Sequence, residues 1–205
     1  DGDRLVVPDS TDFDFGTGAF TIECWFNVSV INGTTQSARN QIIGKWGYNG
    51  DWCLSISSSG NKVQFWIYDV VAVEWTTTPT TGTWYHCAVV REGTGTNETK
   101  MYIDGVEVDT GTVATNFPQA GASHDIYIGQ QGTTSWQATD RDYEGYLDEI
   151  RISNSARYTA AFTTFGQDGG TIASPTPFTS DANTKLLLHG DATAATGKQT
   201  RVHAT

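Results

Sequence analysis

Apolar and polar residues alternate along short stretches of the chain, which is the period of a β-strand that turns one face to a core. In FTIECWF (20–26), Phe20, Ile22, Cys24 and Phe26 share one face, so this segment is expected to be half-buried. The same alternation, bounded by clusters of Gly, Asn, Asp, Ser and Thr, predicts further strands at 4–7, 41–46, 52–57, 62–68, 70–76, 84–90, 100–104, 124–129, 145–152 and 185–189. No ten-residue window has an amphipathic helical stripe, so an all-β chain is expected.

The clearest turn is Asp104-Gly105, which separates MYI from VEV. Both central residues of a type I′ turn need φ > 0, and Asp-Gly satisfies this, so 100–109 are expected to form a tight hairpin. Many short strands with such turns predict two packed antiparallel sheets, a jelly-roll sandwich, over residues 1–165. Residues 166–183 are rich in Gly, Pro, Ser and Thr and predict a long connection to a closing strand and tail in 184–205 of the same domain.

Composition narrows the class of protein. A chain of 205 residues with 38% hydrophobic and 12% aromatic residues suits one globular domain. The formal net charge of −11 argues against nucleic acid as a partner, because phosphate binding needs clustered Lys and Arg. No apolar run approaches the ~18 to 20 residues of a membrane helix, so no membrane insertion is expected.

The three cysteines, Cys24, Cys53 and Cys87, lie inside apolar strand patterns without a paired spacing motif. They are interpreted as small buried hydrophobic residues, with one disulfide as the alternative.

Four stretches in order resemble the laminin-G-like and pentraxin-like jelly-roll domains of the concanavalin A-like superfamily. They are FTIECWF (20–26), WYHCAVVR (84–91), MYIDGV (101–106) and GYLDEIRI (145–152). The stretches at 151–158 and 186–191 are similar to a subset found in phage and environmental surface or tail proteins. The resemblance implies a module on a virion surface or in the extracellular space.

The expected function is non-catalytic recognition or adhesion, with a glycan or glycoprotein surface as the partner. The alternative is a structural subunit of a phage appendage or extracellular filament, in which 184–205 pairs with a neighbouring copy instead of closing its own sheet. A glycoside hydrolase is a distant third, because the Glu-x-Asp-x-x-Glu string of laminarinase-type relatives and the Gly-x-Ser-x-Gly motif are absent from the chain.

The resemblance also raises calcium, which this superfamily often binds in loops at a sheet rim and which needs six to eight oxygen ligands. The two carboxylates of the pentraxin site are missing from the matching stretch IGQQGT (128–133). A different single site is expected at Asp3, Asp142 and Asp148, provided that the first strand pairs with 145–152, as similar sandwiches imply. The alternative is that these carboxylates are simply solvated.

Aromatic residues in loops are candidates for sugar contact, because the apolar faces of pyranoses pack on aromatic rings. Two loops contain them, and the candidate ligand residues are Trp46 and Tyr48 in one loop and Trp136, Gln137, Asp140 and Tyr143 in the other. Together the two loops are expected to form a ligand rim, unless the rings cap the ends of the core. Tryptophans within strands, Trp66 among them, are expected to serve packing.

Overall fold

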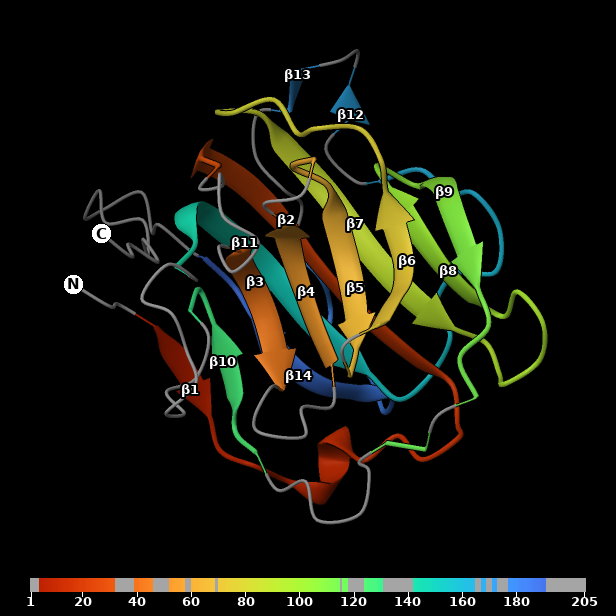
Figure 1. The fold of residues 1–205 in the computed structure, drawn as a ribbon. Coiled ribbons are helices and arrows are strands. Elements are labelled where there is room, and N and C mark those ends of the chain that lie inside the picture. Colours follow the sequence, from red (N-terminus) through yellow and green to blue (C-terminus); the bar gives the residue numbers. More distant parts are fainter. Residues whose placement is uncertain are drawn as a thin grey trace.

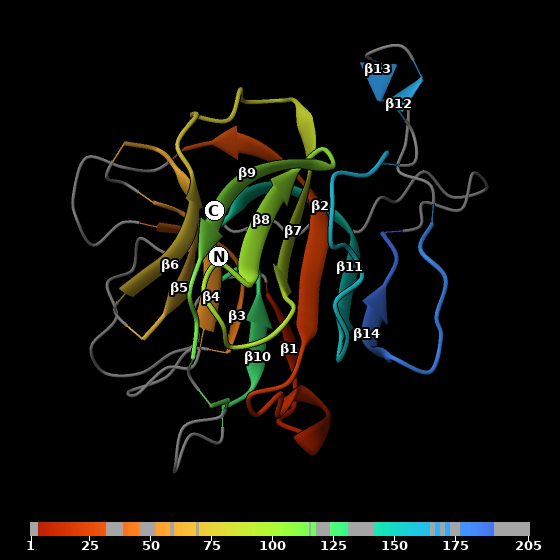
Figure 2. The same ribbon diagram turned by 90° about the vertical axis from the view of Figure 1, so that its right-hand side faces the viewer.

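The structure is a computed structural model that describes residues 4–31, 39–45, 52–57, 60–68, 70–114, 116–117, 124–130, 142–164, 167–168, 171–172 and 177–190. Two six-stranded antiparallel sheets pack face to face (Figures 1 and 2). The predicted all-β, two-sheet jelly-roll sandwich is therefore confirmed. Among the described residues, no helix is long and apolar enough to cross a membrane.

The first sheet has the order β1-β10-β3-β4-β5-β6. Its strands are β1 (Leu5–Val7), β10 (Ile126–Ile128), β3 (Arg39–Lys45), β4 (Trp52–Ser57), β5 (Val63–Ile67) and β6 (Val70–Trp75).

The second sheet has the order β14-β11-β2-β7-β8-β9. Its strands are β14 (Thr184–Leu188), β11 (Glu144–Ser153), β2 (Phe20–Val30), β7 (Trp84–Arg91), β8 (Thr99–Ile103) and β9 (Val106–Gly111). A short 3-10 helix, η1 (Thr11–Phe13), follows β1, and β12 (Gln167–Asp168) pairs with β13 (Thr171–Ile172).

The core lies between the inner faces of the two sheets, as the alternation of the strands requires. Phe20, Ile22, Cys24 and Phe26 of β2 are all buried in it, as expected from FTIECWF. The ring of Phe20 packs 6.1 Å from that of Phe65 on the first sheet, measured between centroids. Burying each such large apolar side chain stabilises the fold by about 1.5–3 kcal/mol.

The predicted hairpin at Asp104-Gly105 is confirmed, since both residues have positive φ, 50° and 79°. It joins β8 to β9, and the Asp104 carboxylate accepts a 2.8 Å hydrogen bond from the His86 backbone N–H. This contact fixes the hairpin against β7.

The expected pairing of the first strand with 145–152 is wrong. β1 instead pairs with β10, with Leu5 opposite Ile128, and so belongs to the other sheet. The free edge of β11 is taken by β14, with Leu188 opposite Ile150. The closing strand 184–188 therefore completes the sheet of its own chain.

All three cysteines are buried thiols that form no disulfide with one another. Cys24 and Cys87 lie opposite each other on β2 and β7, and burial raises the pKa of both thiols. The interpretation as small buried hydrophobic residues is confirmed.

Candidate ligand-binding face

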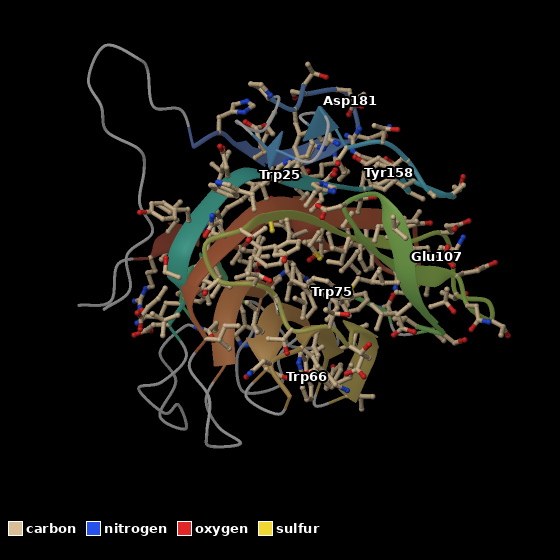
Figure 3. All side chains as sticks on the ribbon, turned by 90° about the horizontal axis from the view of Figure 1, so that it is seen from above. Trp25, Trp66, Trp75, Glu107, Tyr158 and Asp181 are labelled. Carbon is tan, nitrogen blue, oxygen red and sulfur yellow. The ribbon has the colours of Figure 1, made fainter. Side chains whose placement is uncertain are left out.

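The outer face of the first sheet carries a polar and aromatic surface made by strand alternation. In β5, Val63, Phe65 and Ile67 point into the core. Gln64 and Trp66 consequently point outward. Figure 1 views the molecule with the first sheet in front, and Figure 3 shows Trp66 on the side of the sandwich opposite Trp25 and Tyr158.

Strand register arranges the outward side chains into two rows. The first is the aromatic row, in which Tyr127, Gly44, Cys53 and Trp66 lie opposite one another on β10, β3, β4 and β5. Three strand spacings of about 4.8 Å put the two aromatic positions roughly 14 Å apart. Gly44 and Cys53 between them are small and buried, and the Gln41 amide lies 3.5 Å from Cys53 Sγ.

The second row is the polar row, formed by Gln41, Ser55, Gln64 and Glu74 on β3, β4, β5 and β6. Glu74 accepts 2.8 Å hydrogen bonds from Gln64 Nε2 and Lys62 Nζ, and these hydrogen bonds lower its pKa. By contrast, the buried Ser55 Oγ and Gln64 Oε1 have no hydrogen-bond partner. An unpaired buried polar atom costs about 1–3 kcal/mol, so this pair of atoms can gain stability from a ligand.

The chemistry of the two rows suits a polyhydroxylated ligand. Trp66 is a partly exposed ring against which an apolar face of the ligand can pack. The adjacent Ser55 and Gln64 are 0% and 6% exposed, so their hydroxyl and amide can bond ligand hydroxyl groups only when the side chains around them move aside. Arg4, whose guanidinium lies 5.4 Å from the centre of the Tyr127 ring, adds a positive charge at the other end of the aromatic row.

Most of the ligand residues expected from the sequence lie outside the described residues: Trp46, Tyr48, Trp136, Gln137 and Asp140. The strands that carry their loops are nonetheless described. The loop with Trp46 follows Lys45 at the end of β3, whereas the loop with Trp136 follows Gln130 just after β10. Since β3 and β10 are antiparallel, the two loops leave these strands at opposite ends.

Tyr143 does not suit the expected role in ligand contact. Its side chain is 0% exposed and packs in the core, and its hydroxyl donates to the Tyr146 backbone carbonyl at 3.4 Å. Burial raises the pKa of its phenol.

The described carboxylates of the expected metal site do not come together. Asp142 Oδ1 accepts a 2.6 Å hydrogen bond from Gln130, and Asp148 Oδ1 accepts 2.7 Å bonds from the backbone N–H groups of Glu149 and Gly190. They are six positions apart, roughly 15–20 Å along extended chain. Asp3 lies outside the described residues, and no three His, Cys, Asp or Glu side chains within them are grouped to hold a metal ion.

The outer face of the second sheet is different, because segments 154–164 and 177–183 lie over it (Figure 2). There Glu23 is fully buried and accepts hydrogen bonds from Arg151 Nε at 2.7 Å and the Tyr158 hydroxyl at 2.8 Å, with His86 Nε2 at 3.1 Å. Burial alone raises the pKa of Glu23, but the hydrogen bond of His86, the charge of Arg151 and the hydroxyl of Tyr158 outweigh it and lower that pKa. The expectation of a half-buried β2 is therefore wrong, since both of its faces are covered.

Sequence reasoning missed the two rows because it looked for ligand residues in loops. The available signal was the alternation VQFWI (63–67), which places Gln64 and Trp66 on the face opposite Phe65. The burial of Glu23 had no such local signal, since its partners come from residues 86, 151 and 158.

The fold is a jelly-roll sandwich of two six-stranded antiparallel sheets. The outer face of the second sheet is covered by later segments, and the outer face of the first sheet carries the aromatic and polar rows. The chain belongs to the concanavalin A-like lectin/glucanases superfamily, whose laminin-G family model matches residues 1–161. No curated protein sequence matches the chain.

Three solved structures illustrate the likeness. A candidate carbohydrate-binding protein from Bacteroides ovatus superposes with a TM-score of 0.63 at 17% identity over 94% of this chain and 50% of its own. Domain 4 of AbnA, a GH43 extracellular arabinanase from Geobacillus stearothermophilus, in complex with arabinotriose, gives 0.54 at 21% over 75% and 67%. A heptameric SAP-like pentraxin from Limulus polyphemus gives 0.53 at 14% over 76% and 70%. At these identities the likeness shows the fold, and this chain spans about half the length of the Bacteroides protein.

Proposed function

We propose that this chain is a non-catalytic glycan-binding module that acts in the extracellular space or on a virion surface. It binds saccharide on the outer face of the first sheet, with the Trp66 ring against a sugar face. The observation that carries the proposal is the pair of unpartnered buried atoms, Ser55 Oγ and Gln64 Oε1, beside Trp66. Sugar hydroxyls both donate and accept hydrogen bonds, so they can satisfy both atoms.

The comparisons support the ligand class. The Bacteroides ovatus protein is a candidate carbohydrate-binding protein, and domain 4 of the arabinanase holds arabinotriose. These are properties of those proteins, and they make saccharides the first ligands to test on this chain.

The absence of catalysis is part of the proposal. Glycoside hydrolysis by the usual mechanisms needs two carboxyl groups about 5–10 Å apart that flank one bond. Along the aromatic and polar rows as described, Glu74 is the one carboxylate, and it is already hydrogen-bonded to Lys62 and Gln64.

The loops and calcium complete the proposal. Trp46 and Trp136 belong to loops attached at opposite ends of β3 and β10, and we propose that these loops add contacts to the glycan held at Trp66. A calcium ion held by Asp3 and Asp142 would bind Asp142 through Oδ2, because Oδ1 already accepts the Gln130 amide. The loop contacts and the calcium site are tested together with glycan binding.

The test is a glycan array with the purified chain, in calcium and in EDTA, followed by titration of the best ligand. Trp66→Ala removes the stacking ring and is expected to weaken binding about tenfold or more, and Gln64→Ala about fivefold. Trp84→Ala is the matched control, because Trp84 is also a partly buried strand tryptophan but lies on the second sheet beside Tyr146. This control is expected to bind like the wild type.

Other outcomes are equally informative. A silent array with a folded protein contradicts the proposal and favours the structural-subunit alternative, for which light scattering then measures assembly. Release of reducing sugar from a bound glycan contradicts the non-catalytic part. Loss of binding in EDTA supports calcium, and loss in Trp46→Ala or Trp136→Ala supports the loops.

A further inference from the structure

A cavity lies on the other side of the sandwich from the proposed glycan face, between the second sheet and the segments that cover it. Its volume is about 220 Å³, and we call it the His86 pocket. The lining is mostly aromatic, with His86 and Thr164 as its buried polar residues. The lining includes Trp25, His86, Tyr158, Phe162, Thr164 and Phe178.

Aromatic rings surround His86. Phe162 and Phe178 meet the imidazole edge-on with centroids 5.8 Å away, and the ring of Trp25 lies 5.5 Å away. In Figure 3, Trp25 and Tyr158 lie on the same side of the sandwich. The pocket is thus apolar around one imidazole.

Two buried polar atoms of the lining are unpaired. His86 is 1% exposed, and its Nδ1 has no hydrogen-bond partner. Thr164 is 4% exposed, and its Oγ1 also has none. Buried side-chain polar atoms in native proteins nearly always have a partner, so two orphans in one cavity point to a ligand that supplies hydrogen bonds.

The network behind His86 decides which hydrogen bond its free nitrogen makes. An ionised carboxylate only accepts, so Glu23, which is held by Arg151 and Tyr158, requires a proton on His86 Nε2. Arg151, 2.7 Å from the Glu23 carboxylate, already balances its charge, so the imidazole needs no charge of its own in this aromatic surrounding. In the neutral ring with the proton on Nε2, Nδ1 carries a lone pair and accepts. The complementary ligand therefore has an O–H or N–H donor.

We propose that the His86 pocket binds a neutral molecule of one or two rings whose hydroxyl or N–H group donates to His86 Nδ1. An apolar cavity of about 150 Å³ holds benzene, so 220 Å³ has room for a ring with a polar substituent. The Thr164 hydroxyl accepts or donates a second hydrogen bond to the same molecule. This site is independent of the proposed glycan face, which belongs to the other sheet.

The test uses phenol as the probe and toluene as its matched control, because they share the ring and differ in the donor. Both are titrated into the full chain by calorimetry, and the ¹⁵N resonance of His86 Nδ1 is followed by NMR. Phenol is expected to bind about five- to tenfold more tightly than toluene and to shift the Nδ1 resonance. Toluene is expected to leave that resonance in place.

Variants then separate the contribution of the Thr164 hydroxyl to phenol binding from that of the apolar lining. Thr164→Val keeps the shape and removes Oγ1, so it is expected to weaken phenol about fivefold and leave toluene unchanged. Thr159→Val is the control, because Thr159 is exposed and does not line the pocket.

Three results overturn the proposal: no binding of either probe up to its solubility, as for a cavity that holds only water; equal binding without a shift of Nδ1; or loss of phenol binding in Trp66→Ala. The last result places the probe on the glycan face. Because Trp66→Ala tests that face separately, failure of one proposal does not mimic failure of the other.

Discussion

The outer faces of the two sheets are made by the same strand alternation, yet they differ in what lies over them. Each carries a glutamate: Glu23 on the second sheet is 0% exposed, and the Glu74 side chain on the first is 26% exposed. Glu23 is covered by segments from the C-terminal part of the chain, whereas Glu74 on β6 meets Gln64 of the neighbouring strand β5 and Lys62, which directly precedes β5. The covering segments therefore explain why a charged outward residue such as Glu23 is fully buried, whereas on the first sheet the small or neutral outward residues Ser55 and Gln64 are buried and Glu74 is not.

Burial also changes what each glutamate needs. A carboxylate taken out of water is tolerated only when charges and hydrogen bonds replace the lost hydration. Glu23 obtains these from three side chains on three different segments, Arg151, Tyr158 and His86. The covered face is therefore expected to report on folding, and the outward face of the first sheet on binding.

The largest effect is expected from removing the buried glutamate. Glu23→Ala leaves the Arg151 charge unpaired under the covering segments, which is expected to lower the free energy of unfolding by about 3–5 kcal/mol. Glu74→Ala breaks a partly exposed ion pair with Lys62 and removes the acceptor of Gln64 Nε2, and is expected to cost about 1–2 kcal/mol. Urea denaturation of both variants measures the difference, and equal losses would remove the contrast between the faces.

The next effect concerns a glycine under the covering segment. Gly105 has φ +79°, and a Cβ there would overlap the backbone carbonyl of Phe162. The backbone N–H of Phe162 donates a 2.9 Å hydrogen bond to the Gly105 carbonyl. Gly105→Ala is expected to cost about 2–4 kcal/mol, from backbone strain plus displacement of the segment. Gly60→Ala, at φ +81° with only the Lys62 side chain nearby, carries the strain alone and is expected to cost about 1–2 kcal/mol. Thermal unfolding compares the two, and a similar cost would mean that the segment yields freely.

Gly105 also shows which parts of the fold can be predicted from the sequence. The hairpin at Asp104-Gly105 was predictable because the need for positive φ is local. That Phe162 packs on this turn was not, because it depends on a contact between residues 57 positions apart. The same holds for Glu23, whose alternation indicated the outward direction but not the cover.

Two errors of the candidate site have the same origin. The pairing of the first strand with 145–152 failed because strands of similar pattern compete for an edge, and β14 takes the edge of β11. Asp142 and Asp148 were grouped on that pairing and lie apart without it. The alternation of apolar and polar residues predicts which face of a strand is buried, whereas the neighbouring strand depends on the order of the strands in the sheet.

A smaller effect follows from the titration of Glu23. Its pKa in the folded state is below the ordinary value of 4.5, because His86, Arg151 and Tyr158 together outweigh the opposing effect of burial. Its contribution to stability is therefore complete above about pH 4.5 and is lost as the pH falls through the lower folded pKa. Between pH 6 and pH 3 (roughly the range that brackets this titration), the wild type is expected to lose more stability than Glu23→Gln. Parallel pH profiles would show that this carboxylate is not the group that titrates.

The smallest expected effect on stability is on the first sheet and separates folding from binding. Ser55 Oγ is buried without a partner, so Ser55→Ala removes an unsatisfied hydroxyl and is expected to leave stability unchanged or raise it by up to about 1 kcal/mol. If that hydroxyl is kept for a saccharide, the same variant is expected to weaken glycan binding severalfold. Ser57→Ala, on the next outward position of β4, is the control for binding. A residue whose removal helps the fold and harms the complex belongs to the ligand, whereas loss of stability in Ser55→Ala would assign the hydroxyl to the fold.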